Sequence, residues 1–383
     1  MDKPTIQEIF YRFYPAYLEK YAPSTVQAKA ARNIMNCKTG AYGYNVCMCE
    51  DCGAMQLHYN SCRNRCCPMC QAVPKEQWID ARKEDILDAP YFHLVFTVPD
   101  ILNPIIYSNQ KLLYDALYHA ASSTIHELTN DSKYLGAQVG YLCILHTWGS
   151  ELNFHPHIHT ILLGGGLTSN QKWKDNGNDF FLPISVISKV FRGKYMSELK
   201  QLWEEKKLVF YGTAKKYRNS YVFKELLNTC YSMEWIPHCK KTFSGASSVI
   251  QYLGKYTHRL AISNHRILRI EEDTVTFWVK DYREEGKWKE CTLCGVEFIR
   301  RFLMHIPPKR FVRIRYYGIL CSRTKKQKLT LCRNLLGCQK YLSKLRGMEL
   351  PRILEHLYGI NIGVCKSCGG SLGKPQLRIP LRC

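Results

Sequence analysis

Eight of the chain's nineteen cysteines fall within 34 residues, between Cys37 and Cys70. So short a segment cannot bury enough apolar surface to fold by itself, and cross-links or metal ions must replace the missing core. In a reducing compartment, clustered cysteines bind metal more often than they form disulfides. The cluster therefore predicts a small metal-stabilised module near the N-terminus.

The spacing inside the cluster is typical of zinc ligands. Two CxxC knuckles are separated by fourteen residues, and together they offer four thiolates to one tetrahedral ion: Cys49, Cys52, Cys67 and Cys70. Of the remaining cysteines, Cys37, Cys47, Cys62 and Cys66, three can join a histidine such as His58 around a second ion, with Cys37, Cys62 and Cys66 as the candidate set. The alternative is a set of free buried thiols. We expect one or two structural Zn²⁺ ions.

Two more CxxC pairs lie outside the cluster. Cys291 and Cys294 are flanked by a predicted strand and a predicted helix, and we expect them to be structural. Cys365 and Cys368, in the tail sequence CKSCGG, resemble a knuckle without a partner. This tail pair either binds zinc or remains reduced.

Histidines interrupt the apolar pattern of the stretch SELNFHPHIHTILLGG, residues 150–165. In a strand, residues i and i+2 share a face, so His157 and His159 point the same way while Ile158 turns into the core. Two imidazoles on one face can hold one divalent ion. His155 has the same parity but precedes Pro156, so it is either a third ligand or only a neighbour. Alternatively, all three are ordinary side chains of a half-exposed strand.

Two tyrosines are four residues apart in SSVIQYLGKYTHRLAI, a stretch with helical spacing near residues 246–258. On a helix, Tyr252 and Tyr256 lie on one face, about one turn from each other. The alternative is that both are packing residues, which is the usual role of tyrosine in amphipathic helices. Lys255 places a positive charge beside them.

Together these two features predict phosphoryl transfer. A histidine-bound ion withdraws electron density from a phosphate, and a tyrosine oxygen then attacks phosphorus, leaving a phosphotyrosine and a free 3′ hydroxyl. A phenol with a pKa of about 10 needs the ion, or a cation such as Lys255, to favour phenolate. Two tyrosines permit two successive cleavages. The third metal ligand is His155, Gln251 or another residue.

The net charge of +22, from 54 Lys and Arg against 32 Asp and Glu, favours a polyanionic partner, nucleic acid first. The segment PPKRFVRIRYYG alternates cations with aromatics, as single-stranded nucleic-acid grooves do. The candidate DNA contacts are basic residues near the knuckles, the tyrosines and this segment: Arg63, Arg65, Arg259, Lys309, Arg310, Arg313 and Arg315. A solvated basic surface is the alternative.

The remaining pattern predicts an α+β fold. Residues 91–99, 139–149 and 157–166 are rich in aromatic and β-branched residues and predict strands, the last ending in glycines that can turn. Residues 105–130 and 186–208 have helical spacing. We therefore expect a mainly antiparallel sheet with helices on one face.

The order of these features suggests three segments. Residues 1–85 would hold an N-terminal helix and the zinc module, residues 86–320 the nuclease domain, and residues 321–383 a basic C-terminal region. No apolar run approaches the ~18 residues of a membrane span, and the start lacks the features of a signal peptide. We expect a cytoplasmic, nucleoid-associated protein without a membrane partner.

The chain resembles the IS-ninety-one family of insertion-sequence transposases over about residues 35–320. The matching stretches occur in the family's order: YNSCRNRCCPMCQ, YFHLVFTVP, HTWGSELNFHPHIHTILLGGGL, YLGKYTHRLAISNHRI and FIRRFLMHIPPKRFVRIRYYG. One departure is Cys66, where the family pattern has histidine; cysteine can replace histidine as a zinc ligand.

The resemblance implies a zinc-binding module and a nuclease domain of the rolling-circle type. By position, His157 and His159 would bind the catalytic Mg²⁺ or Mn²⁺, and Tyr252 and Tyr256 would be the nucleophiles. The substrate would be single-stranded DNA at transposon ends. A replication initiator with the same chemistry and a zinc-finger DNA-binding protein without catalysis are the alternatives, and neither the DNA sequence nor the oligomeric state follows from the sequence.

Overall fold

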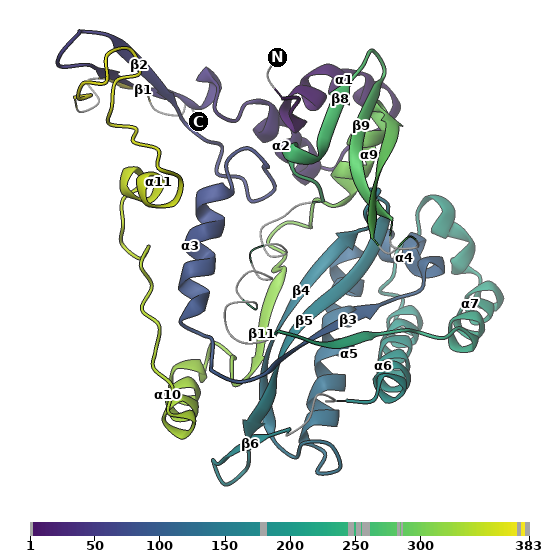
Figure 1. Cartoon of the computed structure of the whole chain (residues 1–383). Helices are drawn as coiled ribbons and strands as arrows, with labels where there is room; N and C mark the ends of the chain where they lie inside the picture. Colours follow the sequence, from purple (N-terminus) through teal and green to yellow (C-terminus); the bar gives the residue numbers. More distant parts are fainter. Residues whose placement is uncertain are drawn as a thin grey trace.

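The computed structural model describes residues 3–176, 182–243, 249, 254, 261–281, 284, 286–373 and 377–379, the side chains of 240–243 and 377–379 excepted. A six-stranded antiparallel sheet forms its centre, with strand order β11-β4-β5-β3-β7 and β6 paired to β5 (Figure 1). The strands are β3 (Tyr91–Thr97), β4 (Gln138–Trp148), β5 (Phe154–Leu167), β6 (Trp173–Asp175), β7 (His238–Phe243) and β11 (Ile314–Gly318).

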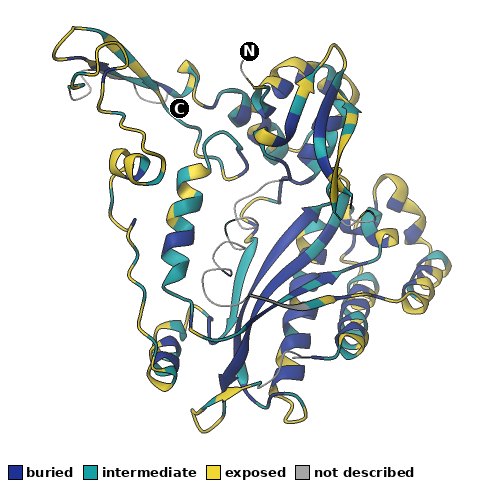
Figure 2. Cartoon of the chain, viewed as in Figure 1, coloured by how far each residue is buried: buried dark blue, intermediate teal, exposed yellow. Residues whose placement is uncertain are grey.

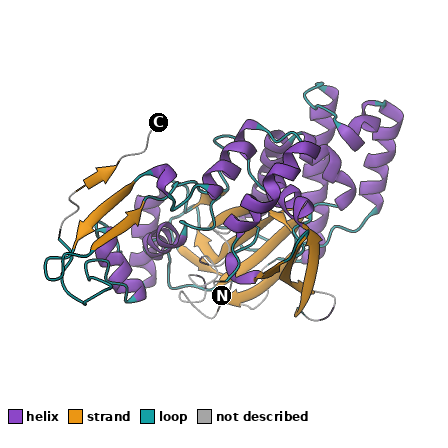
Figure 3. Cartoon of the chain, turned by 90° about the horizontal axis from the view of Figure 1, so that it is seen from above, coloured by secondary structure: helices purple, strands orange, loops and turns teal. Residues whose placement is uncertain are grey.

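One face of this sheet is covered by the longest helices, as Figure 3 shows from above. Alternate residues of the central strands point to them: Phe92 and Phe96 of β3, and Ile158 and Leu162 of β5, are all buried in this core. The covering elements are η2 (Asp100–Leu102), α4 (Asn103–Ser108), α5 (Gln110–Asn130), α6 (Ile184–Glu204), η3 (Gly212–Arg218) and α7 (Ser220–Ser232).

The opposite face of the sheet carries the other set of alternate residues. Ile161 and Leu163 of β5 pack with Leu329 and Cys332 of α10 (Lys325–Leu336), a helix that lies towards the bottom of Figure 1. Val249 belongs to the same core. Further along the strands this face carries histidines in place of aliphatic residues, and the apolar core on this side ends there.

The N-terminal helices pack with a second, three-stranded sheet from the middle of the chain. Helix α1 is capped by Thr5, whose side chain accepts from the Glu8 N–H, and Ile6 and Phe10 bury its apolar face. A capping box between Ser24 and Gln27 starts the next helix. The elements of this body are α1 (Ile6–Lys20), α2 (Thr25–Met35), η4 (Asn264–Arg266), β8 (Ile267–Ile270), β9 (Thr274–Asp281), β10 (Lys287–Cys294) and α9 (Gly295–Met304).

A third sheet joins the two ends of the chain. Strand β1 (Tyr44–Met48) forms a hairpin with β2 (Met55–Tyr59), and its other edge pairs with β12 (Leu377–Ile379). Helix α3 (Ala72–Lys83) leads from this region to β3, and the C-terminal segment returns through α10 and α11 (Leu350–Tyr358) (Figure 1). One short turn, η1 (Gly40–Tyr42), precedes β1.

The expected α+β class with a mainly antiparallel sheet is confirmed. The apolar cores join segments that are distant in sequence. Residues from the ranges 6–37 and 261–306, for example, belong to one core. The boundaries 1–85, 86–320 and 321–383 remain a prediction. Among the described residues, no helix has the length and apolarity to cross a membrane. Figure 2 shows the most continuous burial along β4, β5 and the helices behind them.

Candidate active site

Three imidazoles converge on the sheet face opposite α5 and α6. His157 and His159 lie two residues apart on β5, and His146 lies on the neighbouring strand β4, directly opposite His157. One ring nitrogen from each lies within 4.8 Å of the others. Ile158, between the two β5 histidines, is fully buried on the other face. Strand parity therefore places His157 and His159 as expected, and the cross-strand register adds His146.

Hydrogen bonds orient the two β5 imidazoles. The Nδ1 of His157 lies 2.7 Å from the backbone oxygen of His155, and since a carbonyl can only accept, this nitrogen carries the proton. Burial is the main cause that lowers the pKa of His157 to about 4, so the ring is neutral and its Nε2 is a lone-pair donor. That Nε2 lies 3.0 Å from Nε2 of His159. Two nitrogens at this distance fit adjacent ligands of one ion, at about 2.1 Å from each.

A fourth histidine, His93 of β3, lies behind the group. Its Nε2 is 2.9 Å from Nδ1 of His159, and the two rings stack at 5.2 Å. Burial, and to a lesser extent His238, lowers the pKa of His93 to about 4; burial also lowers that of His159. When His159 donates its Nδ1 proton to His93, its Nε2 presents a lone pair beside that of His157. This is the usual outer support of a metal-binding histidine.

Sequence reasoning offered His155 or Gln251 as the third ligand. His155 is not in the group: its Nδ1 lies 3.1 Å from Oδ1 of Asp100, at the start of β5. Gln251 lies outside the described residues. His146 was missed because only the pairing of β4 with β5 brings it to the site. The available signal was a polar residue on the inward-alternating side of an otherwise apolar strand.

The cysteines form two groups of four, and their membership differs from the expected one. The first group lies where the end of α2 meets the loop before α3: Cys37, Cys62, Cys67 and Cys70. Their sulfur atoms lie within 4.8 Å of one another. Hydrogen bonds from Cys62 and Cys67 lower the pKa of the Cys37 thiol to about 7, which favours a thiolate at neutral pH.

Cys66 stands apart from this group, contrary to its expected membership. It is 4% exposed, and burial raises the pKa of its thiol although Arg313 and Arg65 lie nearby. Its backbone N–H donates to Oδ1 of Asn64 at 2.8 Å. His58, the suggested fourth ligand, lies on β2 and is also outside the group.

The second group combines residues from the two ends of the chain. Cys49 and Cys52 were expected to share an ion with Cys67 and Cys70, but they lie beside the tail pair, Cys365 and Cys368. The two cysteines of each CxxC pair lie together as expected, but the two pairs belong to different groups. Spacing fixes which two thiols share a loop, whereas only the return of the chain decides which loops meet.

Comparison with known proteins identifies the family. A family described as "Transposase zinc-binding domain" matches residues 9–98, and one described as "Putative transposase" matches residues 140–328. The chain is 39% identical over 336 residues to "Putative transposase y4qJ" of Sinorhizobium fredii (strain NBRC 101917 / NGR234), covering 87% of this chain and 84% of that protein.

The chain belongs to the IS-ninety-one family of insertion-sequence transposases. It is also 29% identical over 318 residues to "Transposase for insertion sequence element IS801" of Pseudomonas savastanoi pv. phaseolicola, covering 80% of this chain and 73% of that protein. No solved structure matches it. A member of this transposase family acts on DNA, and its cysteine groups agree with the matched zinc-binding domain.

The predicted nucleophiles of this transposase, Tyr252 and Tyr256, lie outside the described residues, as do Lys255 and Arg259. Within residues 246–258, Val249 and Gly254 are described. Val249 is buried against the histidine-bearing face of the sheet. A Cβ on Gly254 would lie 2.9 Å from Cδ1 of Ile79, so its backbone passes close to α3.

Several of the predicted DNA contacts also make contacts within the protein, and their role in binding DNA stays a prediction. Arg315 pairs with Asp115 and stacks over Tyr118 at 4.0 Å, on the α5 side of the sheet. Arg313 is partly buried over Trp148, and Arg65 donates to the backbone oxygens of Phe311 and Pro308. Part of the positive charge in and near residues 308–318 therefore lies on side chains that pack within the protein. Three of the described candidates are exposed and stay predicted surface contacts for DNA: Arg63, Lys309 and Arg310.

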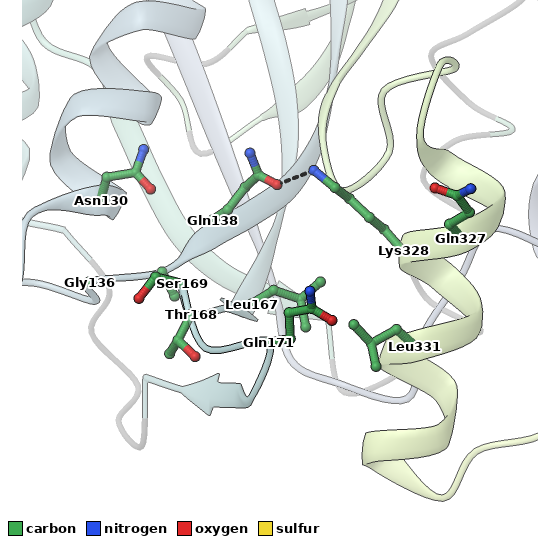
Figure 4. Close-up of a pocket in the computed structure, with 11 residues that line it drawn as sticks. Asn130, Gly136, Gln138, Leu167, Thr168, Ser169, Gln171, Gln327, Lys328 and Leu331 are labelled. Carbon is green, nitrogen blue, oxygen red and sulfur yellow. Dashed lines mark hydrogen bonds between the residues drawn. The ribbon is translucent and has the colours of Figure 1, made fainter.

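A cavity of about 750 Å³ lies at the other end of the central strands (Figure 4). Gln138 at the start of β4 and Leu167 at the end of β5 line it, with Lys328 and Leu331 of α10. Its lining contains no pair of groups suited to acid–base or metal chemistry. The histidine group, at the opposite ends of the same strands, is therefore the candidate active site.

Proposed function

We propose that this transposase cleaves and rejoins single-stranded DNA at transposon ends through a phosphotyrosine, with a divalent ion held by His146, His157 and His159. The convergence of three imidazoles on one face of the sheet supports this more than any other observation. It would act in the cytoplasm, at the nucleoid.

The donor set favours Mn²⁺ over Mg²⁺. Mg²⁺ prefers oxygen ligands, whereas imidazoles suit transition-metal ions, and three imidazoles leave coordination positions for phosphate oxygens. An ion bound there would neutralise the charge that develops on the scissile phosphate. Packing within the protein shields His146 from solvent and orients its ring, because it stacks on Trp148 at 4.5 Å and is 3% exposed.

The nucleophile in this proposal is Tyr252 or Tyr256. Its oxygen forms a bond to phosphorus, the bond to the 3′ oxygen breaks, and that oxygen leaves with a proton as a 3′ hydroxyl. Attack by a 3′ hydroxyl on the phosphotyrosine reverses the step and rejoins the strand. Val249, three residues before Tyr252, lies on the histidine face of the sheet, which supports this assignment. Lys255 would favour the phenolate.

Labelled single-stranded DNA carrying a transposon end tests the proposal directly. Incubation with Mn²⁺ should give a protein–DNA adduct that survives a denaturing gel. The Tyr252→Phe/Tyr256→Phe double variant should give no adduct above background, because the attacking oxygen is absent. Tyr221→Phe, at an exposed tyrosine of α7, is the matched control and should leave the yield unchanged.

The outcomes separate the candidate functions. An adduct that persists in the double variant would reject these tyrosines as nucleophiles. A wild-type protein that binds the DNA but forms no adduct would instead favour a zinc-binding DNA protein without catalysis. An adduct formed at a replication origin rather than at transposon ends would favour an initiator.

A further inference from the structure

The two knuckles of the second cysteine group are built alike, although they are 316 residues apart (Cys49 to Cys365). Each reads CxxCG, and the glycine adopts a left-handed conformation: φ is +70° at Gly53 and +79° at Gly369. In each, the glycine N–H donates to the backbone oxygen of the first cysteine, at 3.1 Å and 2.9 Å. Only glycine takes this conformation without strain.

A further pair of bonds repeats in both knuckles. The N–H of Cys49 donates to the oxygen of Ala54, five residues on, at 2.9 Å; the N–H of Cys365 donates to the oxygen of Gly370 at 2.8 Å. Backbone N–H groups also point at the tail sulfurs, from Ser367 to Cys365 and from Gly370 to Cys368, both at 3.4 Å. Such bonds stabilise thiolates.

The thiol distances match a tetrahedral ion. Sγ of Cys49 lies 3.5 Å from that of Cys368, and Sγ of Cys52 lies 3.8 Å from that of Cys365. A disulfide would need about 2.05 Å. Four sulfurs at about 2.3 Å from one zinc ion would be about 3.8 Å apart, the edge of the tetrahedron.

We propose that Cys49, Cys52, Cys365 and Cys368 bind one structural zinc ion that fastens the C-terminal segment to the N-terminal hairpin. This site is separate from the first cysteine group and from the histidine group, and does not depend on the proposed function. Backbone pairing supports the junction: Glu50 N–H donates to Ser371 oxygen, and Gly373 N–H to Met48 oxygen, both at 3.0 Å.

The segment before the tail knuckle is anchored along α3. Asp80 is 5% exposed and accepts from Tyr341 Oη, Ser343 Oγ and the Leu345 N–H, at 2.7, 2.6 and 2.9 Å. Between Leu345 and the tail knuckle, most residues are exposed. The zinc site would thus hold the far end of a segment that is already fixed at α3 (Figure 1).

Metal content of the purified full-length chain tests the site. The Cys365→Ser/Cys368→Ser variant should hold one zinc ion fewer per chain than wild type, measured by mass spectrometry under native conditions and by elemental analysis. Cys49→Ser/Cys52→Ser should lose the same single ion, and all four substitutions together should lose no more than one. Cys291→Ser/Cys294→Ser, a CxxC pair outside both groups, should lose none.

Limited trypsin digestion gives a second readout. Cleavage after Arg352, an exposed residue of α11, should be at least several-fold faster in the Cys365→Ser/Cys368→Ser variant, because one anchor is lost. The inference is overturned if either pair can be replaced without loss of zinc, if the two losses add to two ions, or if iron replaces zinc at this site. Adduct formation in the same preparations reports separately on the tyrosine chemistry.

Discussion

His93 decides which nitrogen of His159 carries the proton. Its Nε2 faces Nδ1 of His159 at 2.9 Å, and the other ring nitrogen of His159 faces His157. If His93 accepts, the two β5 histidines present lone pairs to the same point. If His93 donates, His159 can give its Nε2 proton to His157, and neither β5 histidine keeps a lone pair for an ion. His93, which is not itself a proposed ligand, therefore controls whether the two β5 histidines can bind an ion.

Replacing His93 should weaken the proposed metal site while leaving its three ligands in place. We expect His93→Ala to raise the Kd for Mn²⁺ by 10- to 100-fold, the usual cost of losing such a support. Titration calorimetry on the protein measures it, with both cysteine groups already loaded with zinc. His126→Ala, at an exposed histidine of α5, is the control. An unchanged Kd for His93→Ala would reject the role of His93.

Among the elements, β5 shows how tertiary contacts extend a strand beyond its sequence pattern. Its glycines were expected to turn, yet the strand continues through Gly165 and Gly166 to Leu167. A Cβ at Gly165 would lie 2.5 Å from the Trp173 ring, and one at Gly166 would lie 2.5 Å from the backbone oxygen of Gln138. The glycines thus permit close approach of neighbouring strands, which is a second common use of glycine in sheets.

Helix α9 is fastened to the turn between β4 and β5 by one buried histidine at its C-terminal end. Nε2–H of His305 donates to the Leu152 oxygen at 3.1 Å, and its Nδ1 accepts from Oγ1 of Thr147 at 3.2 Å. Only the bond from Thr147 requires the neutral ring, because a protonated ring has no lone pair on Nδ1, whereas the bond to Leu152 can persist. Burial lowers the pKa of His305 to about 4.

This junction should make stability depend on pH. The unfolded chain takes up the His305 proton near its ordinary pKa of about 6.5, whereas the folded chain does so only near 4, so the contribution is complete above pH 6.5 and is lost as pH falls to 4. The lost free energy is about 3 kcal/mol. Urea unfolding should show a smaller fall between these pH values for His305→Gln than for wild type. Equal falls would contradict this.

Across the whole molecule, the charge of +22 is shared between packing and exposed surface. Arg315 and Arg65 are engaged internally, whereas Lys309 and Arg310 lie exposed just before β11, the edge strand of the main sheet. Some of the predicted basic contacts are therefore already engaged within the protein, while the net charge still favours a polyanionic partner.

Binding of single-stranded DNA should weaken steeply with salt. For about six phosphate contacts, affinity should fall by roughly 10²-fold between 50 and 200 mM salt through counterion release. The Lys309→Ala/Arg310→Ala variant should reduce the slope of log K against log salt by about 1.4. Lys200→Ala, at an exposed lysine of α6 on the far face of the sheet, should leave it unchanged. Fluorescence anisotropy measures these slopes, and a flat response would argue against an electrostatic interface here.

The sequence alone determined much of what depends on near neighbours along the chain. Residues two apart in a strand share a face, so the sequence pairs His157 with His159. Cysteines three apart in a knuckle share a loop, so the sequence also predicts each CxxC pair. The apolar spacing also predicted the main strands and the helices behind them, because burial of one face imposes that period.

Only the tertiary structure decided which of these local units meet. It brought His146 to the β5 histidines through strand register, left His155 beside Asp100, and joined Cys49 and Cys52 to a tail more than three hundred residues away. Local periodicity carries no information about these distances. These long-range contacts are set by the packing of the apolar cores. Closing a long loop costs little more entropy than closing a short one, so packing can select the partner.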